Sequence, residues 1–197
     1  LSNQNLYHTV YYHKLGTDQS EDRVIYEDRD NPKMNHYGGV TEDERFLIMY
    51  KQPGTDGFAT YYMDLTQDSL NGELKLLFEG FGNKSSVVDN TDNKLLVLTD
   101  IDAPNYRLIE VDLNNTAKAN WKDIIPATDN LLEGVSTGGG KLFASYLEKA
   151  TNRIYQMNYD GSDKIAIELP GLGSAGGFSG KKEDTELFYS FTSFIYP

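Results

Sequence analysis

Polar turns and short apolar runs follow one another along this chain at nearly even intervals. A polar turn leading into an apolar run occurs four times, as EDERFLIMY, TDNKLLVLT, GGGKLFASY and EDTELFYSF. The first apolar residues of these runs are spaced by 49, 47 and 45 residues, at Phe46, Leu95, Leu142 and Leu187. A second set of apolar segments has spacings of 50, 48 and 46 residues, when aligned on Leu15, Leu65, Leu113 and Tyr159. Because two independent landmarks share one period, the chain is predicted to be an array of structural repeats.

Each repeat is predicted to contain four short β-strands. The apolar runs are bounded by Gly, Asn, Asp and Pro, which are strand and turn signals, and no convincing helix separates them. The first strand of each repeat is small and polar, at 37–41, 85–89, 134–137 and 174–178. Four antiparallel strands in about 40 to 50 residues are typical of one β-propeller blade, whose inner strand has little room for bulky side chains. The predicted fold class is therefore all-β, a β-propeller, and the alternative is a β-sandwich with accidental periodicity.

The repeats predict one partial propeller domain over residues 1–197, with three complete blades at 37–80, 85–128 and 131–171. Residues 1–30 supply segments like third and fourth strands, and residues 174–197 supply segments like first and second strands. Because unpaired edge strands favour pairing, these two half blades are expected to form a composite fourth blade. It would close within one chain as a four-bladed ring or between two chains as an end-exchanged homodimer, and the sequence leaves both open.

The composition fits a globular β protein and disfavours several kinds of partner. Hydrophobic residues make up 39% of the chain, and 14 Tyr and 9 Phe favour strands. A net charge of -12 repels phosphate backbones, so no nucleic-acid partner is expected. No apolar run approaches the roughly 18 residues of a membrane span, so the protein is expected to be soluble with no membrane association. The absence of cysteine leaves the compartment open, with cytoplasm and periplasm both allowed.

No catalytic, cofactor or metal site is predicted from the residues of this chain. The segment GLGSAG, Gly171–Gly176, has the spacing of a dinucleotide-binding loop, but strand-like sequence follows it instead of a helix. Ser179 in GFSGK lacks the second glycine and the strand-to-helix turn of a nucleophile elbow. His8 and His13 are expected in one tyrosine-rich strand and, like His36, as packing or surface residues. The acidic segments DNTDN and DGSD are interpreted as turns and not as calcium loops.

Three stretches resemble the propeller of the prolyl oligopeptidase family: LYHTVYYHKLGTDQSEDRVIYE at 6–27, NYRLIEVDL at 105–113 and GFSGKKEDTELFYSFTSFIYP at 177–197. The similarity covers essentially the whole chain, and the first and last stretches are specific. The resemblance implies a parent serine peptidase, a hydrolase that cleaves short peptides after proline. In that family a seven-bladed propeller covers the active site of an α/β-hydrolase domain. The family's catalytic Ser, Asp and His lie in the hydrolase domain, and no position of this chain matches them, so the chain itself is predicted to be non-catalytic.

The resemblance also implies that propeller loops help to line the substrate cavity. One such loop reads KQPGTDG and places Gln52 where familiar members have an arginine, and Thr55 where a small thiol can occur. A charge-based substrate contact at Gln52 is therefore not carried over. Asn35, just before HYGG, is a further candidate for the same cavity wall. The candidate rim residues of the substrate cavity are thus Asn35, Gln52 and Thr55.

Two functions are consistent with these observations. In the first, the chain is the non-catalytic propeller part of a prolyl oligopeptidase-like enzyme and admits short proline-containing peptides to a hydrolase domain, which would follow Pro197. The chain starts without Met or a signal-peptide pattern and begins and stops within strand-like sequence, so a piece of a longer protein is expected. In the second, the chain is a stand-alone propeller whose acidic face binds a basic protein. An α/β sequence encoded after Pro197 would favour the first.

Overall fold

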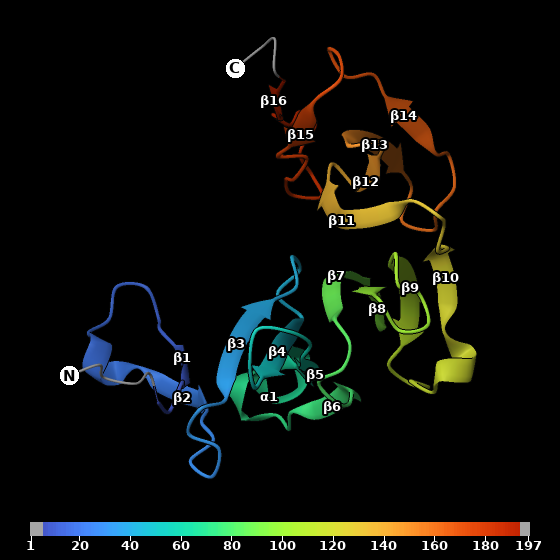
Figure 1. The fold of residues 1–197 in the computed structure, drawn as a ribbon. Helices are drawn as coiled ribbons and strands as arrows, with labels where there is room; N and C mark the ends of the chain where they lie inside the picture. Colours follow the sequence, from blue (N-terminus) through green and yellow to red (C-terminus); the bar gives the residue numbers. More distant parts are fainter. Residues whose placement is uncertain (1–5, 194–197) are drawn as a thin grey trace, which may run out of the picture. The chain divides into compact units, whose positions relative to one another are not determined.

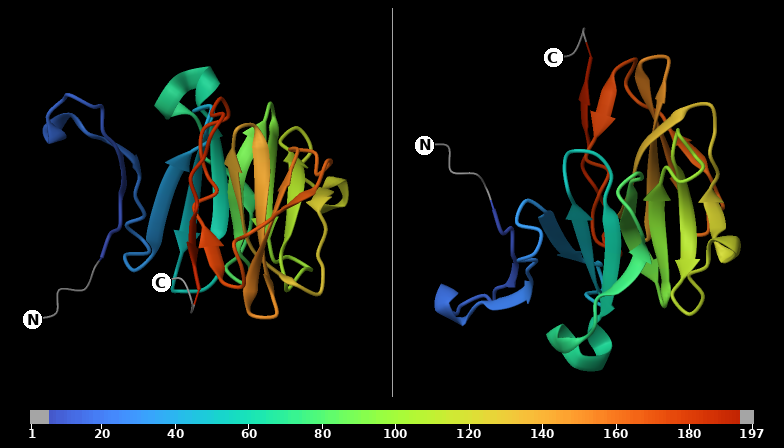
Figure 2. Two further views of the ribbon diagram at one scale, coloured as in Figure 1. Left: turned by 90° about the horizontal axis from the view of Figure 1, so that it is seen from above. Right: turned by 60° about the horizontal axis from the view of Figure 1, so that its bottom comes forward.

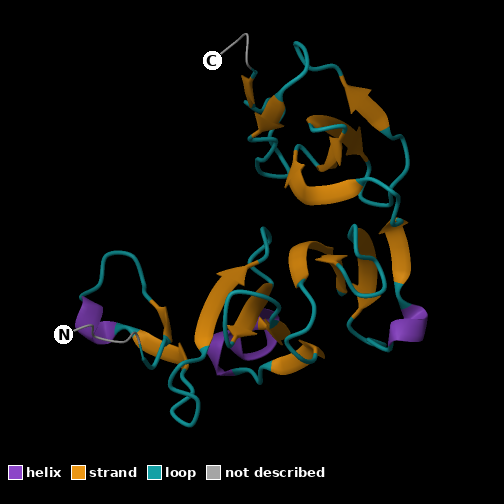
Figure 3. Cartoon of the chain, in the orientation of Figure 1, coloured by secondary structure: helices purple, strands orange, loops and turns teal. Residues whose placement is uncertain are grey.

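The computed structural model describes residues 6–193 and consists mainly of β-strands (Figure 3). The chain forms two compact units, residues 1–85 and 86–197. The described part contains three four-stranded antiparallel sheets and two two-stranded pairs. This arrangement confirms the predicted all-β fold class. The helical segments are short: α1 (Leu65–Asp68) and the 3-10 turns η1 (Gln19–Glu21), η2 (Ser69–Asn71) and η3 (Lys118–Asn120).

The first unit is built on one four-stranded sheet in the order β3-β4-β5-β6 (Figure 1). Its strands are β3 (Asn35–Val40), β4 (Phe46–Gln52), β5 (Ala59–Asp64) and β6 (Lys75–Phe78). The run FLIMY in β4 is apolar without alternation because both faces of this strand are covered, and its first four residues are all buried. This burial explains why the second strand of the repeat carries the clearest sequence signal.

The N-terminal strand pair of the first unit is β1 (Val10–Tyr12) with β2 (Arg23–Tyr26), and it lies beside β3 (Figure 1). The expectation that His8 and His13 share a strand is wrong. Tyr7 has a positive φ of 60° and donates its N–H to the Pro32 carbonyl at 2.7 Å, which holds the chain out of the strand before Val10. His13 follows the C-terminal end of β1, and its Nδ1 lies 2.6 Å from Asp22 Oδ1.

The second unit contains two four-stranded sheets, in the orders β10-β9-β8-β7 and β11-β12-β13-β14. Figure 2 shows the strands of each sheet from two further directions. The first sheet consists of β7 (Ser85–Thr91), β8 (Lys94–Thr99), β9 (Arg107–Asp112) and β10 (Lys122–Ile125). The second consists of β11 (Leu131–Gly138), β12 (Lys141–Glu148), β13 (Thr151–Met157) and β14 (Ile165–Ile167). One apolar core joins them, with Leu96 and Leu108 from one sheet against Leu132 and Leu142 from the other.

The C-terminal strand pair of the second unit is β15 (Ser174–Gly176) with β16 (Ser190–Thr192). It packs beside β13, and Phe178 stacks on Phe143 with ring centroids 5.8 Å apart. The glycine segment GLGSAG leads into β15 and not into a helix, which agrees with its interpretation as a loop. The sequence ELFYSFTSF predicted a longer second strand, but only Ser190–Thr192 is paired, because β15 is its only strand neighbour in the described chain.

The two halves of the predicted composite fourth blade belong to different units, and each is described within its own unit. β1 and β2 make one two-stranded sheet, and β15 and β16 make another. Each pair is packed within its own unit, β1 beside β3 and β15 beside β13. Closure of the fourth blade within one chain and exchange between two chains therefore both stay predictions.

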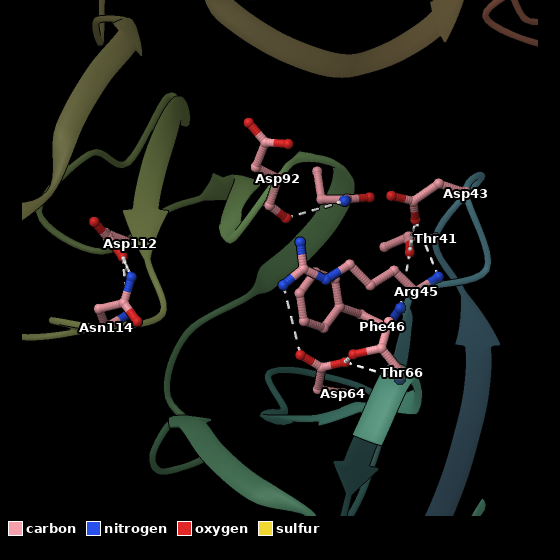
Figure 4. Close-up of polar contacts among 10 residues, drawn as sticks. Thr41, Asp43, Arg45, Phe46, Asp64, Thr66, Asp92, Asp112 and Asn114 are labelled. Carbon is pink, nitrogen blue, oxygen red and sulfur yellow. Dashed lines mark hydrogen bonds and ion pairs between the residues drawn. The ribbon is translucent and has the colours of Figure 1, made fainter. Parts of the chain in front are cut away.

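Turn chemistry repeats from sheet to sheet, as the sequence predicted. The turn between the first and second strands carries a residue with positive φ in each sheet, at Glu44 (59°), Asp92 (50°) and Gly139 (56°). After the third strand, Asp64 Oδ1 accepts the Thr66 N–H at 2.9 Å, and Asp112 Oδ1 accepts the Asn114 N–H at 2.8 Å (Figure 4). Short polar side chains that bond the backbone two residues on are typical turn formers. In the acidic segment DNTDN, the first three residues belong to β7, and only Asp92 and Asn93 form the turn to β8.

Candidate functional site

Two of the three predicted rim residues lie directly opposite each other. Asn35 is the first residue of β3, Gln52 is the last residue of β4, and the two are Cα partners in the register of these strands. Both side chains are half-buried. Directly opposed residues of antiparallel strands project to the same face, so the two side-chain amides are neighbours at one end of the sheet. Each amide offers both a donor and an acceptor, which suits a peptide backbone or a neutral side chain.

Lys51 anchors this end of the sheet from the opposite face. Its Nζ lies 4.4 Å from the ring centroid of Tyr26 and 4.8 Å from that of Tyr61. A cation held against two aromatic faces is favourable and restricts the side chain. The ring contacts of Lys51 therefore fix this end of the strand. Because successive strand residues face opposite ways, Gln52 lies on the other face of the sheet.

Thr55 lies in the loop between β4 and β5 and is exposed. The residues that follow it in this loop are held by two contacts. Phe58 N–H donates to the Asn83 carbonyl at 3.0 Å, and Asp56 Oδ1 lies 2.6 Å from Lys84 Nζ. The hydrogen bond from Lys84, together with its charge, lowers the pKa of Asp56 from its usual value. The structure therefore holds the base of the loop in which Thr55 is exposed.

Asn35 also lines a polar cavity of about 500 Å³ in the first unit, together with His8, Tyr11, Met34 and Tyr37. Gln52 and Thr55 do not line it. The tyrosine rings and the histidine give this cavity aromatic walls with hydrogen-bonding tips, a combination that suits uncharged ligands. Sequence reasoning did not select His8, because a histidine among tyrosines near a strand looks the same whether it packs, lies on the surface or lines a cavity.

Two hydrogen bonds join His8 to His36. The His36 backbone N–H donates to His8 Nδ1 at 3.0 Å, so this nitrogen of His8 must carry a lone pair. His36 Nδ1 lies 2.6 Å from the His8 carbonyl oxygen, so this nitrogen of His36 must carry the proton. The rings of Tyr26 and His36 pack in a T-shaped arrangement, with centroids 5.0 Å apart. These contacts agree with a packing role for His36, which is buried.

His13 and Asp22 form a histidine–carboxylate contact, but no hydroxyl is hydrogen-bonded to the other ring nitrogen of His13 within residues 6–193. Over the same residues, no group of three or more His, Cys, Asp or Glu side chains could hold a metal ion. No helix in the described part of the chain is long and apolar enough to cross a membrane.

The repeated four-stranded antiparallel sheets define a β-propeller class of protein. A family profile for the prolyl oligopeptidase N-terminal β-propeller domain matches residues 1–197. The chain therefore belongs to the prolyl oligopeptidase family, in that N-terminal domain.

Known relatives agree with this assignment. The chain is 38% identical over 190 residues to the prolyl endopeptidase of Elizabethkingia meningoseptica, and this alignment covers 96% of this chain and 26% of that protein. It is 28% identical over 219 residues to the prolyl endopeptidase of Dictyostelium discoideum, and this alignment covers 98% of this chain and 27% of that protein. The chain thus spans about a quarter of the length of these curated relatives.

Solved structures give the same answer for the fold. A structure from a mechanistic study of two prolyl endopeptidases and their inter-domain dynamics matches with a TM-score of 0.88 at 29% identity, covering 100% of this chain and 29% of that one. The apo structure of prolyl oligopeptidase B from Galerina marginata matches with a TM-score of 0.87, covering 98% of this chain and 28% of that one. Its identity of 20% supports the fold alone.

Proposed function

We propose that this chain is the non-catalytic propeller part of a serine endopeptidase that acts on short proline-containing peptides, and that it filters the peptides that reach a hydrolase domain. The observation that carries the proposal is the match of the N-terminal propeller profile over residues 1–197, with relatives that are prolyl endopeptidases. Its partners in this role are the hydrolase domain and the peptide substrates. A second copy of the chain is a further proposed partner.

The paired amides of Asn35 and Gln52 are the proposed contact with substrate. They are neutral, half-buried and adjacent in the strand register. A peptide segment flanking the cleaved bond offers carbonyl and N–H groups that such amides can hydrogen-bond without a charge requirement. The absence of an arginine at Gln52 therefore favours substrates selected by their backbone and not by an acidic side chain.

A comparison of substrates of different size tests the filter in the longer enzyme that carries this chain. We expect kcat/KM to be high for short proline-containing peptides and to fall by orders of magnitude when the same sequence is displayed on a folded protein. The hydrolase domain expressed without residues 1–197 should lose this discrimination. Equal discrimination with and without the propeller would refute a filtering role, whereas an absence of proline-directed cleavage in both forms would refute the peptidase assignment.

A further inference from the structure

Asn71 is the only asparagine of this chain that a glycine follows. It is the last residue of η2 and is exposed. An asparagine side chain cyclises when the backbone nitrogen of the next residue attacks its amide carbon, and a side chain on that next residue hinders the attack. Gly72 has no side chain and the greatest backbone freedom. Asn71 is therefore the asparagine of this chain with the least hindered backbone nucleophile beside it.

The guanidinium of Arg23 binds the amide of Asn71 from a strand far away in the sequence. Arg23 is the first residue of β2, and its Nη2 donates to Asn71 Oδ1 and to the Leu70 carbonyl oxygen, the latter at 3.0 Å. A charged donor polarises the carbonyl that it contacts more strongly than a neutral donor does. Attack on the amide carbon of Asn71 puts negative charge on Oδ1, and a donor already held at that oxygen stabilises such an oxyanion.

Core packing explains why a glycine stands next to Asn71. A Cβ at position 72 would lie 2.9 Å from Met63 Cγ and 3.3 Å from Met63 Sδ. Met63 belongs to β5 and is 4% exposed, so its side chain has little room to move aside. Glycine at position 72 therefore allows the close approach of the backbone to the core of the first unit. A larger residue there would hinder cyclisation of Asn71 but would press on Met63.

The product of cyclisation and hydrolysis also suits the contact with Arg23. Both oxygens that accept from Arg23 Nη2 belong to uncharged groups. A carboxylate at position 71 would give Arg23 an anionic partner, and a guanidinium matches a carboxylate in both charge and geometry. The same side chain therefore favours the charged intermediate and the aspartate that replaces Asn71.

We propose that Asn71 is a site of deamidation through a succinimide and that Arg23 promotes the reaction. The Gly72 nitrogen loses its proton and bonds to Asn71 Cγ, the Cγ–Nδ2 bond breaks, and Nδ2 takes up a proton and leaves as ammonia. Water then opens the imide ring at either carbonyl, which leaves aspartate or isoaspartate at position 71. Water is the only co-reactant, and the reaction does not depend on peptidase activity.

Peptide mapping by mass spectrometry tests the site in the longer enzyme that carries this chain. On incubation at neutral pH, Asn71 should convert to a mixture of aspartate and isoaspartate. Asn115 is the internal control in the same map and should stay unmodified. It is exposed and its Oδ1 accepts a hydrogen bond at 2.8 Å, but the donor is the neutral Asn120 Nδ2, and Thr116 follows it in the chain.

Substitution of Arg23 tests its part in the reaction. Arg23→Leu should slow the conversion of Asn71 by about tenfold, because a donor to the oxyanion is lost at an exposed site. Arg29→Leu removes an exposed arginine of the same unit and should leave the rate unchanged. The native chain should also react faster than the chain unfolded in urea, a comparison that holds even where Arg23→Leu does not fold. A native chain that reacts more slowly than the unfolded one, or a folded Arg23→Leu variant as fast as wild type, would overturn the role of Arg23.

Hydroxylamine gives an independent readout, because it attacks a succinimide and cuts the chain between Asn71 and Gly72. Treatment of the native enzyme should release a fragment that ends at residue 71. Asn71→Gln should give no such fragment, because its longer side chain cannot form the five-membered imide. An uncut native chain, with Asn71 unmodified after an incubation that converts it in the urea-unfolded chain, would overturn the site itself.

Discussion

Lys182 Nζ lies 3.0 Å from Asp89 Oδ2, and this ion pair joins the segment between β15 and β16 to β7 within the second unit. The Asp89 side chain is 1% exposed and that of Lys182 is 34% exposed. Tyr159 Oη donates to the same carboxylate oxygen at 2.6 Å, and Lys182 Nζ also donates to the Asn90 carbonyl at 3.4 Å. A buried carboxylate needs such partners, because the loss of its hydration is otherwise uncompensated.

Removal of this lysine should destabilise the protein. Lys182→Met leaves the buried Asp89 carboxylate without its cation, and we expect a loss of about 2 kcal/mol in the free energy of unfolding, less than for a fully buried pair because Lys182 is partly exposed. Asp89→Asn keeps an acceptor for Tyr159 and should cost less. The double variant should cost less than the sum of the two. Urea denaturation measures all three, with Lys181→Met as the neighbouring control, and equal stabilities of Lys182→Met and the control would contradict the prediction.

The chain alone should have no peptidase activity. The described residues hold no hydroxyl nucleophile bonded to a histidine base, and the contact between His13 and Asp22 lacks the third member. Purified residues 1–197 should therefore leave a fluorogenic proline-containing peptide uncleaved, at the rate of the buffer control. Cleavage that copurifies with the chain and is blocked by a serine-directed reagent would be the contrary result.

The strand content of the complete sheets could be predicted from the sequence because burial there is repetitive. Continuous runs such as FLIMY in β4 are buried on both faces, and the turns that precede the second strands use residues that tolerate positive φ, such as Asp92 and Gly139. The family resemblance led to Gln52 and Asn35, but nothing in the sequence pattern says that they are Cα partners, because register depends on turn geometry.

The ends of the chain could not be predicted in the same way. Local sequence gives strand propensity to the segment around Phe188, but a strand forms only with a partner, and β15 supplies one that is three residues long. The hydrogen bonds between His8 and His36 and the ion pair of Lys182 with Asp89 join residues far apart in the sequence. Such contacts leave no periodic signal, so they had to be found in the structure.

Acid should weaken the contact of Asp64 with Arg45. Burial raises the pKa of Asp64, but the hydrogen bonds from Thr66 and the contact with Arg45 outweigh it and lower this pKa below its usual value of 3.8. A lowered carboxyl pKa gives stability that is present above about pH 4 and is lost as the pH falls through the folded-state pKa. Asp64→Asn keeps the turn acceptor and removes the charge, at a cost of less than about 1 kcal/mol near neutral pH.

The pH dependence of unfolding separates charge from turn geometry at this position. The stability difference between wild type and Asp64→Asn should be constant above about pH 5 and shrink as the pH falls below about 4. Asp129→Asn is the control, since this exposed carboxylate has no ion pair within residues 6–193. A difference that grows on acidification would have the wrong sign and would rule out a stabilising charge.

Gln52→Ala should affect substrate binding more than stability in the longer enzyme. If the paired amides contact the peptide, the variant should raise KM for proline-containing peptides by about threefold or more, while kcat changes less. Gln156→Ala is the matched control, because Gln156 is also a half-buried strand glutamine but lies in β13. Unchanged KM values on several peptides would remove Gln52 from the candidate site.

Gly57 should be indispensable for the loop that presents Thr55. It has a φ of +66°, and a Cβ at this position would lie 1.9 Å from the Phe81 carbonyl oxygen, a backbone atom that cannot move alone. Gly57→Ala should therefore cost at least about 2 kcal/mol in unfolding free energy, from the strained φ and the backbone clash together. Gly54 lies in the same loop and provides the control: a Cβ there would meet no heavy atom within 4 Å, so Gly54→Ala should change stability by less than about 0.5 kcal/mol. Amide hydrogen exchange localises the effect: Gly57→Ala should speed exchange at Phe58, whose N–H bonds to Asn83, and Gly54→Ala should not. Equal stability and equal Phe58 protection in the two variants would mean that the loop is not held at its base, and Thr55 would then have no fixed position from which to contact a substrate.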